Sequence, residues 1–281
     1  MRTARIYGLR LLAVAAVAMA AAGCWKEDFS DCPGGNLILE TIWDEIDEAD
    51  IPDNYRAVIG TWSETLSGNS NEIGHAFEPG DYRIYVYNTP DKITINGTVA
   101  TIAASGNGTD NMPGLLFTYS GDIAGLAENE YRTVQAYMAQ QVGRITYEIM
   151  ASGENIKEIG SVITTVNSAR LAGIASSINI GTGVLSGSSS VSPRFVLEGR
   201  ERYTAESSIL GTIGTTQTLT IVLTTPSGAT QTLSGDASTV LAGFNTYKRG
   251  SYHIVVTITA VDYNSGNITE WTLNGEPGTI L

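Results

Sequence analysis

Segments in which apolar and polar residues alternate recur along this chain, and they constrain its fold more than any other feature. In residues 82–87 the alternation places Tyr82, Ile84 and Val86 on one face. A period of two is that of a half-buried β-strand, because successive side chains point to opposite faces of a sheet. The same period recurs in residues 92–102, 131–139, 218–225 and 251–261. We therefore predict an all-β fold.

The turns and the composition also favour strands. Asn96-Gly97 divides residues 92–102 and is a strong hairpin signal. The chain has 32 threonines but only four lysines, which suits pleated, half-buried surfaces better than helix surfaces. Only residues 122–130 predict helix, of one or two turns at most. Regular short strands with glycine-rich turns are typical of a β-sandwich or a barrel.

The length of 281 residues allows one large domain or two of ordinary size. We expect a boundary near residues 139–143, which gives an N-terminal β-sandwich domain at 37–139 and a C-terminal β-sandwich domain at 140–281. Within the second domain, the low-complexity stretch 181–192 (GTGVLSGSSSVS) has too little apolar surface to order itself alone. We interpret it as a long surface loop.

The N-terminus has the layout of a lipoprotein signal peptide, which we place at residues 1–23. Arginines precede an apolar run at 11–22 that is too short to span a bilayer. Small residues then precede Cys24, as lipoprotein signal peptidase requires. We expect cleavage before Cys24 and acylation of this residue, so that a lipidated tether at 24–36 holds the protein to the outer membrane. The alternative is an ordinary signal peptide with a chance cysteine.

Lys26, Glu27 and Asp28 follow this cysteine closely. A lysine followed by two acids at this place resembles the export signal that sends Bacteroidetes lipoproteins to the cell surface. We therefore expect a surface-exposed, outer-membrane lipoprotein. The alternative is a polar tether that only lifts the domain off the lipid. Cys32 is the sole other cysteine, so no intramolecular disulfide is expected.

Sequence motifs for catalysis are missing. The two histidines, His75 and His253, lie far apart in the sequence, and no nucleophile elbow, nucleotide-binding loop or cysteine pair is present. We expect no enzyme, no cofactor and no metal site. The formal charge of −13 argues against nucleic-acid binding. The acidic segment 40–53 could hold calcium, but it lacks the EF-hand glycine and glutamate, and we interpret it as a solvated loop.

One aromatic face leaves two interpretations open. Arg83, Tyr85 and Tyr87 share the side of residues 82–87 that is opposite the apolar face. This face could contact a glycan or a protein. The preferred interpretation is that it packs beneath a second sheet.

Several segments together resemble the FimB/Mfa-type fimbrial anchor lipoproteins of Bacteroidetes. The start of the mature chain, CWKEDFSDCP, is similar to the start of those proteins after processing. Weaker similarities lie in residues 77–88, 114–122, 141–147 and 247–256 and at Trp271. The resemblance implies two tandem transthyretin-like β-sandwiches in a lipid-anchored component of type V pili, either the anchor or an accessory subunit.

The resemblance also implies fimbrial subunits as partners, engaged by strand complementation. Polymerising pilins of this type lose an N-terminal strand by cleavage after arginine, but residues 27–54 contain no Arg or Lys. This favours a terminal anchor over a repeating stalk subunit. Pro277 makes the C-terminus a poor donor strand, because proline has no N–H for a ladder.

Two other functions stay open. A surface glycan-binding lipoprotein needs an exposed aromatic platform, for which tyrosines, Trp43 or Trp62 are candidates. A hydrolase on a β-sandwich needs paired carboxylates in a cleft, contributed by distant segments.

Overall fold

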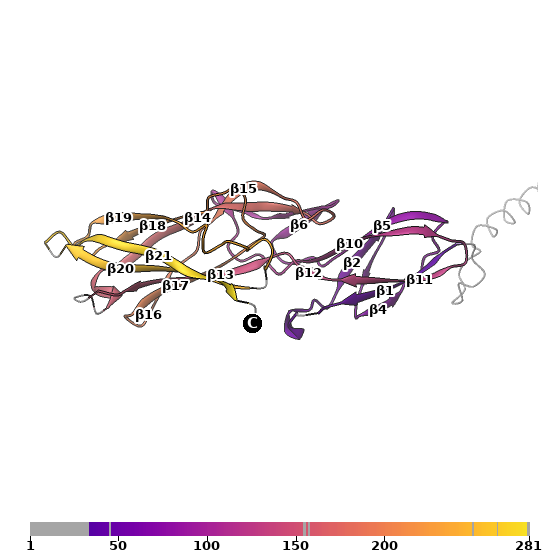
Figure 1. The fold of residues 1–281 in the computed structure, drawn as a ribbon, viewed down its shortest axis with the longest axis horizontal. Helices are drawn as coiled ribbons and strands as arrows, with labels where there is room; N and C mark the ends of the chain where they lie inside the picture. The colour runs from indigo at the N-terminus through magenta and orange to yellow at the C-terminus, as the bar shows by residue number, and fades with distance from the viewer. Residues whose placement is uncertain are drawn as a thin grey trace, which may run out of the picture.

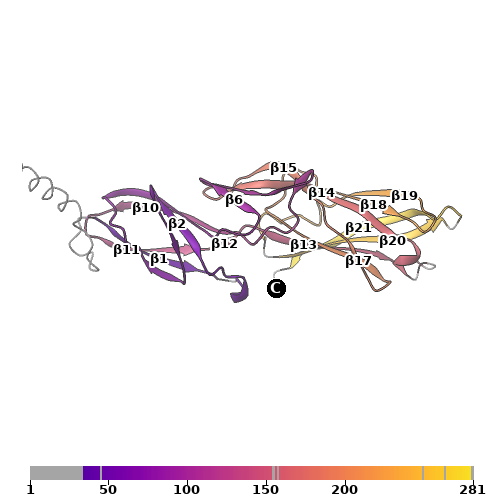
Figure 2. The same cartoon turned by 180° about the vertical axis from the view of Figure 1, so that it is seen from behind.

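The computed structural model describes residues 34–44, 46–153, 156, 158–248, 250–262 and 264–279, the side chains of 251 and 276–279 excepted. These residues form two β-sandwiches arranged end to end in an elongated molecule (Figures 1 and 2). The helical segments of this part are two short 3-10 turns, η2 (Glu48–Asp50) and η3 (Ile159–Ser161). The prediction of an all-β fold with two tandem sandwiches is confirmed. Cys24, Lys26, Glu27 and Asp28 lie outside the described residues, so the predictions for them remain predictions.

The first sandwich packs a three-stranded sheet, in the order β11-β1-β4, against a five-stranded sheet, in the order β12-β10-β5-β2-β3. Trp43, Phe117 and Ile84 lie in the core between the two sheets. The strands are β1 (Asn36–Ile42), β2 (Tyr55–Ile59), β3 (Trp62–Leu66), β4 (Ser70–Glu72), β5 (Gly80–Tyr87), β10 (Phe117–Leu126), β11 (Tyr131–Tyr137) and β12 (Ala139–Gln140).

Strand β1 is the central strand of the three-stranded sheet. It runs parallel to β11 on one side and antiparallel to β4 on the other. Its alternation buries Leu37 and Leu39, each 1% exposed, in the core. Removing β1 would therefore uncover the core of the first sandwich.

The second sandwich packs a five-stranded sheet, in the order β16-β17-β13-β20-β21, against a sheet in the order β19-β18-β14-β7-β6, with β15 also paired to β14. Alternation correctly predicts β18 and β20, whose apolar residues enter the core. The strands are β13 (Gly143–Ala151), β14 (Thr165–Asn179), β15 (Leu185–Val191), β16 (Val196–Glu198), β17 (Arg202–Ile209), β18 (Thr218–Thr224), β19 (Thr230–Asp236), β20 (Ser251–Asp262) and β21 (Asn267–Thr279).

Sheet pairing crosses the expected domain boundary. Residues 93–109, which the sequence assigns to the first domain, form β6 (Ile93–Asn96), β7 (Val99–Ile102), β8 (Ala104–Ser105) and β9 (Gly108–Thr109). The Asn96-Gly97 hairpin is confirmed, but β7 pairs with β14 of the second sandwich. We call residues 93–109 the excursion. Alternation identifies a strand and its buried face, whereas it does not identify the sheet that receives the strand.

Two local predictions are wrong. Residues 122–130 are not helical, because β10 runs to Leu126 with a bulge after Ile123. The stretch 181–192 is not a loop, because β15 forms an antiparallel ladder with β14. Its serines need little apolar surface of their own, since the partner strand supplies the hydrogen bonds that order the backbone.

A third hydrophobic cluster, which we call the joint, connects the sandwiches. It contains Tyr87 and Leu116 from the first sandwich, Ile102 from the excursion, and Ile178 and Leu210 from the second. Tyr85 packs against the joint, as expected if the Tyr85/Tyr87 face lies beneath a second sheet. Arg83 extends the contact by donating a hydrogen bond to the carbonyl of Gly181, at 2.9 Å.

Candidate functional site

Strand β15 presents a backbone edge of the second sandwich. One edge of this strand pairs with β14, and Ser186 and Ser188 are exposed. Gly187, at a φ of 71°, lets the strand pass close to Ser176, whose Oγ an added Cβ would contact. At the far end of β15, β9 covers Ser190, whose carbonyl accepts a hydrogen bond from Thr109 Oγ1 at 3.4 Å. The open edge is therefore residues 185–189.

Other long edge strands carry features that hinder the addition of a strand. On β11, Arg132 donates hydrogen bonds to the carbonyls of Ala124 and Gly125 on β10. On β21, the Gln231 amide bonds both the N–H and the C=O of Ile268, and the register shifts three times. Strands β11, β19 and β21 also contain charged residues or proline, whereas β15 contains neither, and the ladder of β15 with β14 has a single register shift, between Ala172 and Ile174. Charge, proline and bulges are the means by which natural sheets protect their edges.

A second candidate surface is the outer face of the sheet β11-β1-β4, which we call the tyrosine face. Tyr131 is 53% exposed and Tyr137 is 58% exposed. Both project from β11 on the side opposite Val134, Ala136 and Met138, which sequence alternation correctly assigns to the core side. The sequence analysis names tyrosines as platform candidates without singling out these two, although the same alternation places them on the outward face.

Polar groups lie between the two tyrosines. Gln135 Nε2 lies 3.5 Å from Glu40 Oε2 on β1, and Tyr137 Oη lies 3.4 Å from Gln135 Oε1. Both hydrogen bonds are at the long limit, so these groups keep capacity for other partners. Ile38 and Ile42 of β1 lie half-buried on the same face.

Of the two tryptophan candidates from the sequence, Trp43 is buried and Trp62 is partly buried. Trp43 is 9% exposed and packs edge-on against Phe117 in the first core. Trp62 stacks on His75, with 6.3 Å between ring centroids. Trp43 therefore offers no platform, and Trp62 packs partly against the first core.

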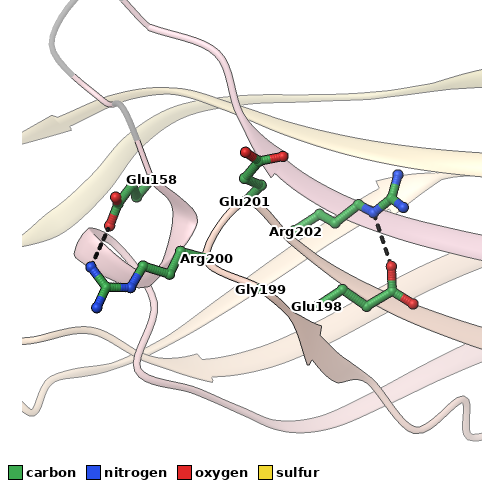
Figure 3. A pocket seen from close by; sticks show the side chains of 6 residues that line it. All are labelled: Glu158, Glu198, Gly199, Arg200, Glu201 and Arg202. Carbon is green, nitrogen blue, oxygen red and sulfur yellow. Dashed lines mark hydrogen bonds and ion pairs between the residues drawn. The ribbon is translucent and has the colours of Figure 1, made fainter.

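A charged hollow lies at the end of the second sandwich that is remote from the first (Figures 1 and 3). Arg200 lies 3.8 Å from Glu158, and Arg202 Nε lies 3.0 Å from Glu198 (Figure 3). These pairs are exposed to solvent, so they contribute little to stability. Glu158 and Glu198 are each paired with an arginine, and the pair of Glu158 connects the turn between β16 and β17 to the start of η3.

Among the described residues, the two histidines lie in different parts of the fold. His253 Nε2 lies 3.4 Å from Glu148 on the neighbouring strand, far along the fold from His75. Within the described ranges, no group of three or more His, Cys, Asp or Glu side chains could hold a metal, and the residues of η2 in the acidic segment are exposed. Burial lowers the pKa of Lys248 to about 8, and its Nζ donates a hydrogen bond to Gln141 Oε1 at 3.1 Å. No described helix has the length and apolar character to cross a membrane.

Solved structures share this fold at low sequence identity. A candidate adhesin from Bacteroides ovatus ATCC 8483 has a TM-score of 0.61 and 16% identity, over 92% of this chain and 98% of that one. The fimbrial anchor protein Mfa2 from Porphyromonas gingivalis has a TM-score of 0.57 and 13% identity, over 87% and 98%. A candidate polysaccharide-binding protein from Bacteroides thetaiotaomicron VPI-5482 has a TM-score of 0.57 and 8% identity, over 85% and 95%.

No protein-family model and no curated protein matches the chain. At these identities the structural likeness establishes the fold and not the function. The likeness extends over both sandwiches and nearly the full length of each solved structure. The chain therefore has the fold of Bacteroides adhesin candidates and of a fimbrial anchor protein, which confirms the resemblance to FimB/Mfa-type proteins at the level of the fold.

Proposed function

We propose that this protein is a lipid-anchored, cell-surface fimbrial anchor or accessory subunit without catalytic activity. The observation that carries the proposal is the shared fold with a fimbrial anchor protein over 87% of this chain and 98% of that chain. The lipoprotein signal expected at residues 1–23 supplies the attachment, through Cys24, and Lys26-Glu27-Asp28 supplies the export signal.

The shape of the molecule supports attachment at one end. The first described residue, Gly34, lies at the end of the first sandwich that is remote from the joint, because its carbonyl accepts a hydrogen bond from the N–H of Asn129, just beyond the far end of β10. A lipid on Cys24 would hold this end near the membrane, and the second sandwich would extend away from it. The second sandwich would then be the part that meets a fimbrial subunit.

Strand addition at β15 is the proposed mode of contact. A partner strand would gain main-chain hydrogen bonds along residues 185–189, and the small serine side chains leave room for its side chains. The C-terminal strand, β21, is already paired with β20 within its own sheet. We therefore favour a contact in which this chain accepts a strand from a fimbrial subunit over one in which it donates its C-terminal strand.

The test is a pull-down of the fimbrial subunits encoded beside this protein, with the mature chain made soluble by Cys24→Ser. We expect capture of one subunit. The double variant Ser186→Lys/Ser188→Lys should abolish capture, because charge on an edge opposes pairing. The matched control, Thr232→Lys/Ser234→Lys, adds the same charge to exposed positions of β19 and should still capture the subunit.

Circular dichroism of each variant serves as the folding control. Capture that survives the β15 lysines would refute the contact at this edge. A folded protein that captures no subunit would refute the fimbrial role. Retention by polysaccharide in that case would favour the second candidate, a surface glycan-binding lipoprotein, for which the exposed Tyr131 and Tyr137 are the supporting observation.

A further inference from the structure

The tyrosine face has the dimensions of an extended binding platform. Tyr131 and Tyr137 stand at the two ends of β11, six residues apart on one side of the strand. At about 3.3 Å per residue, their Cα atoms are separated by roughly 20 Å. Thr133 and Gln135 are exposed between them, and Ile38 and Ile42 form an apolar floor on the neighbouring strand.

The side chains of this face match the chemistry of a sugar chain. A tyrosine ring presents a flat apolar surface together with a hydroxyl group, so it can cover the C–H face of a pyranose and still bond to water or to ligand. The Gln135 amide donates and accepts, and the Glu40 carboxylate accepts hydrogen bonds from hydroxyl groups. The long internal contacts of 3.4 and 3.5 Å leave both groups available to a ligand.

The charge of this face disfavours an anionic ligand. The outward residues of β11, β1 and β4 include Glu40 and Glu72 but no lysine or arginine. An anionic polymer would be repelled here, because the face offers no cation to pair with it. A hydroxyl-rich, uncharged polymer needs only acceptors, donors and apolar cover.

The same sheet is unfavourable for a protein strand. Arg132 bonds to Glu130 and to the carbonyls of Ala124 and Gly125, so that its guanidinium occupies the space between β11 and β10. An added strand would have to displace these hydrogen bonds. A ligand lying on the face of the sheet, in contrast, leaves them intact.

We propose that the outer face of the sheet β11-β1-β4 binds a neutral polysaccharide, with Tyr131 and Tyr137 as stacking platforms and Gln135 and Glu40 as hydrogen-bonding groups between them. This site lies on the first sandwich and is separate from the strand edge of β15. It rests on the second candidate function named above, glycan binding, and does not depend on the fimbrial role.

Native gel electrophoresis in gels containing mannan, dextran or alginate tests the proposal, with the mature Cys24→Ser chain as the sample. We expect retardation by mannan or dextran and none by the anionic alginate. The double variant Tyr131→Ala/Tyr137→Ala should bind the retarding polysaccharide at least tenfold more weakly. The matched control is Tyr247→Ala, which removes a tyrosine that is 53% exposed on the second sandwich and should bind as the parent does.

Three results would overturn the proposal: no retardation by either neutral polysaccharide, equal retardation of the double variant, or equal weakening by Tyr247→Ala. Both tyrosines are more than half exposed, so the double variant should retain the parent circular dichroism spectrum. Capture of fimbrial subunits by this variant is measured in parallel. Loss of polysaccharide binding with capture intact separates this site from the fimbrial contact.

Discussion

Truncation of Ile102 tests whether the excursion contributes to the stability of the second sandwich. Ile102 lies on β7 and is 3% exposed within the joint. Ile102→Ala removes three carbon atoms, worth about 0.8 kcal/mol each on transfer from water. A residual cavity adds to this loss, and measured Ile→Ala substitutions cost about 2–5 kcal/mol. We expect a loss of about 3 kcal/mol in the free energy of unfolding.

The assay must report on the second sandwich alone. Trp271 lies on β21 and packs against the second core, whereas Trp43 and Trp62 pack in or against the first. A chain with Trp25, Trp43 and Trp62 changed to Phe leaves Trp271 as the fluorescent reporter. In this background, Ile102→Ala should lower the midpoint of thermal unfolding by about 6–12 °C, at 2–4 °C per kcal/mol for a protein of this size.

The control is Thr101→Ala, which alters an exposed side chain on the same strand and should change stability by less than about 0.5 kcal/mol. A Trp271 transition that Ile102→Ala does not shift would refute the reasoning. That result would mean that the excursion stabilises the first sandwich only, as the boundary at residues 139–143 implies.

Two further predictions concern the packing of the excursion and the joint. Gly108→Ala should cost about 1–3 kcal/mol of stability in urea unfolding, because the added Cβ meets the carbonyl oxygen of Ser190; Gly160→Ala, where the Cβ meets open space, is the control, and equal stability of the two variants would contradict the close contact. Lys248 has a pKa of about 8 when folded and 10.5 as the ordinary value, so between these values the unfolded chain binds one more proton and stability rises with pH. Urea unfolding from pH 7 to 10 should show this rise in the parent and a flatter profile in Lys248→Met, and identical profiles would exclude Lys248 as the cause. Above pH 10 the raised pKa of buried Tyr147 acts in the opposite direction, because the unfolded chain then loses the tyrosine proton first.

Much of the fold follows from the period-two pattern. The faces of β5, β11, β18 and β20 are buried as the alternation predicts, because one-sided burial leaves a single favourable orientation for each strand. The hairpin at Asn96-Gly97 is determined locally, because a two-residue turn of this kind needs positive φ angles and Gly97 adopts a φ of 59°. These features depend on neighbours in the sequence.

Features that depend on distant partners were missed. Strand β15 is ordered by its ladder with β14, and a run of serines carries no sign of that partner. The sequence assigns the excursion to the first sandwich, whereas β7 pairs with β14 of the second. Its apolar residues could pack in either core, and the sequence alone does not distinguish the two. The tyrosine face was visible in the pattern of β11, but exposure distinguishes Tyr131 and Tyr137 from the buried Tyr87 only once the sheets are packed.

The excursion changes how the two sandwiches can separate. The chain passes from the first sandwich into β6, returns before β10, and passes over again between β12 and β13, so three covalent segments cross the joint. Two tandem domains joined by one linker could swing apart by extending that linker. Here separation also requires β7 to leave β14, which breaks the pairing of Val99–Thr101 with Ser177–Asn179 and exposes the joint residues Ile102 and Ile178 to water. A pull along the long axis therefore meets sheet pairing and apolar burial at the joint, as the proposed attachment by lipid at one end and by a fimbrial subunit at the other would require.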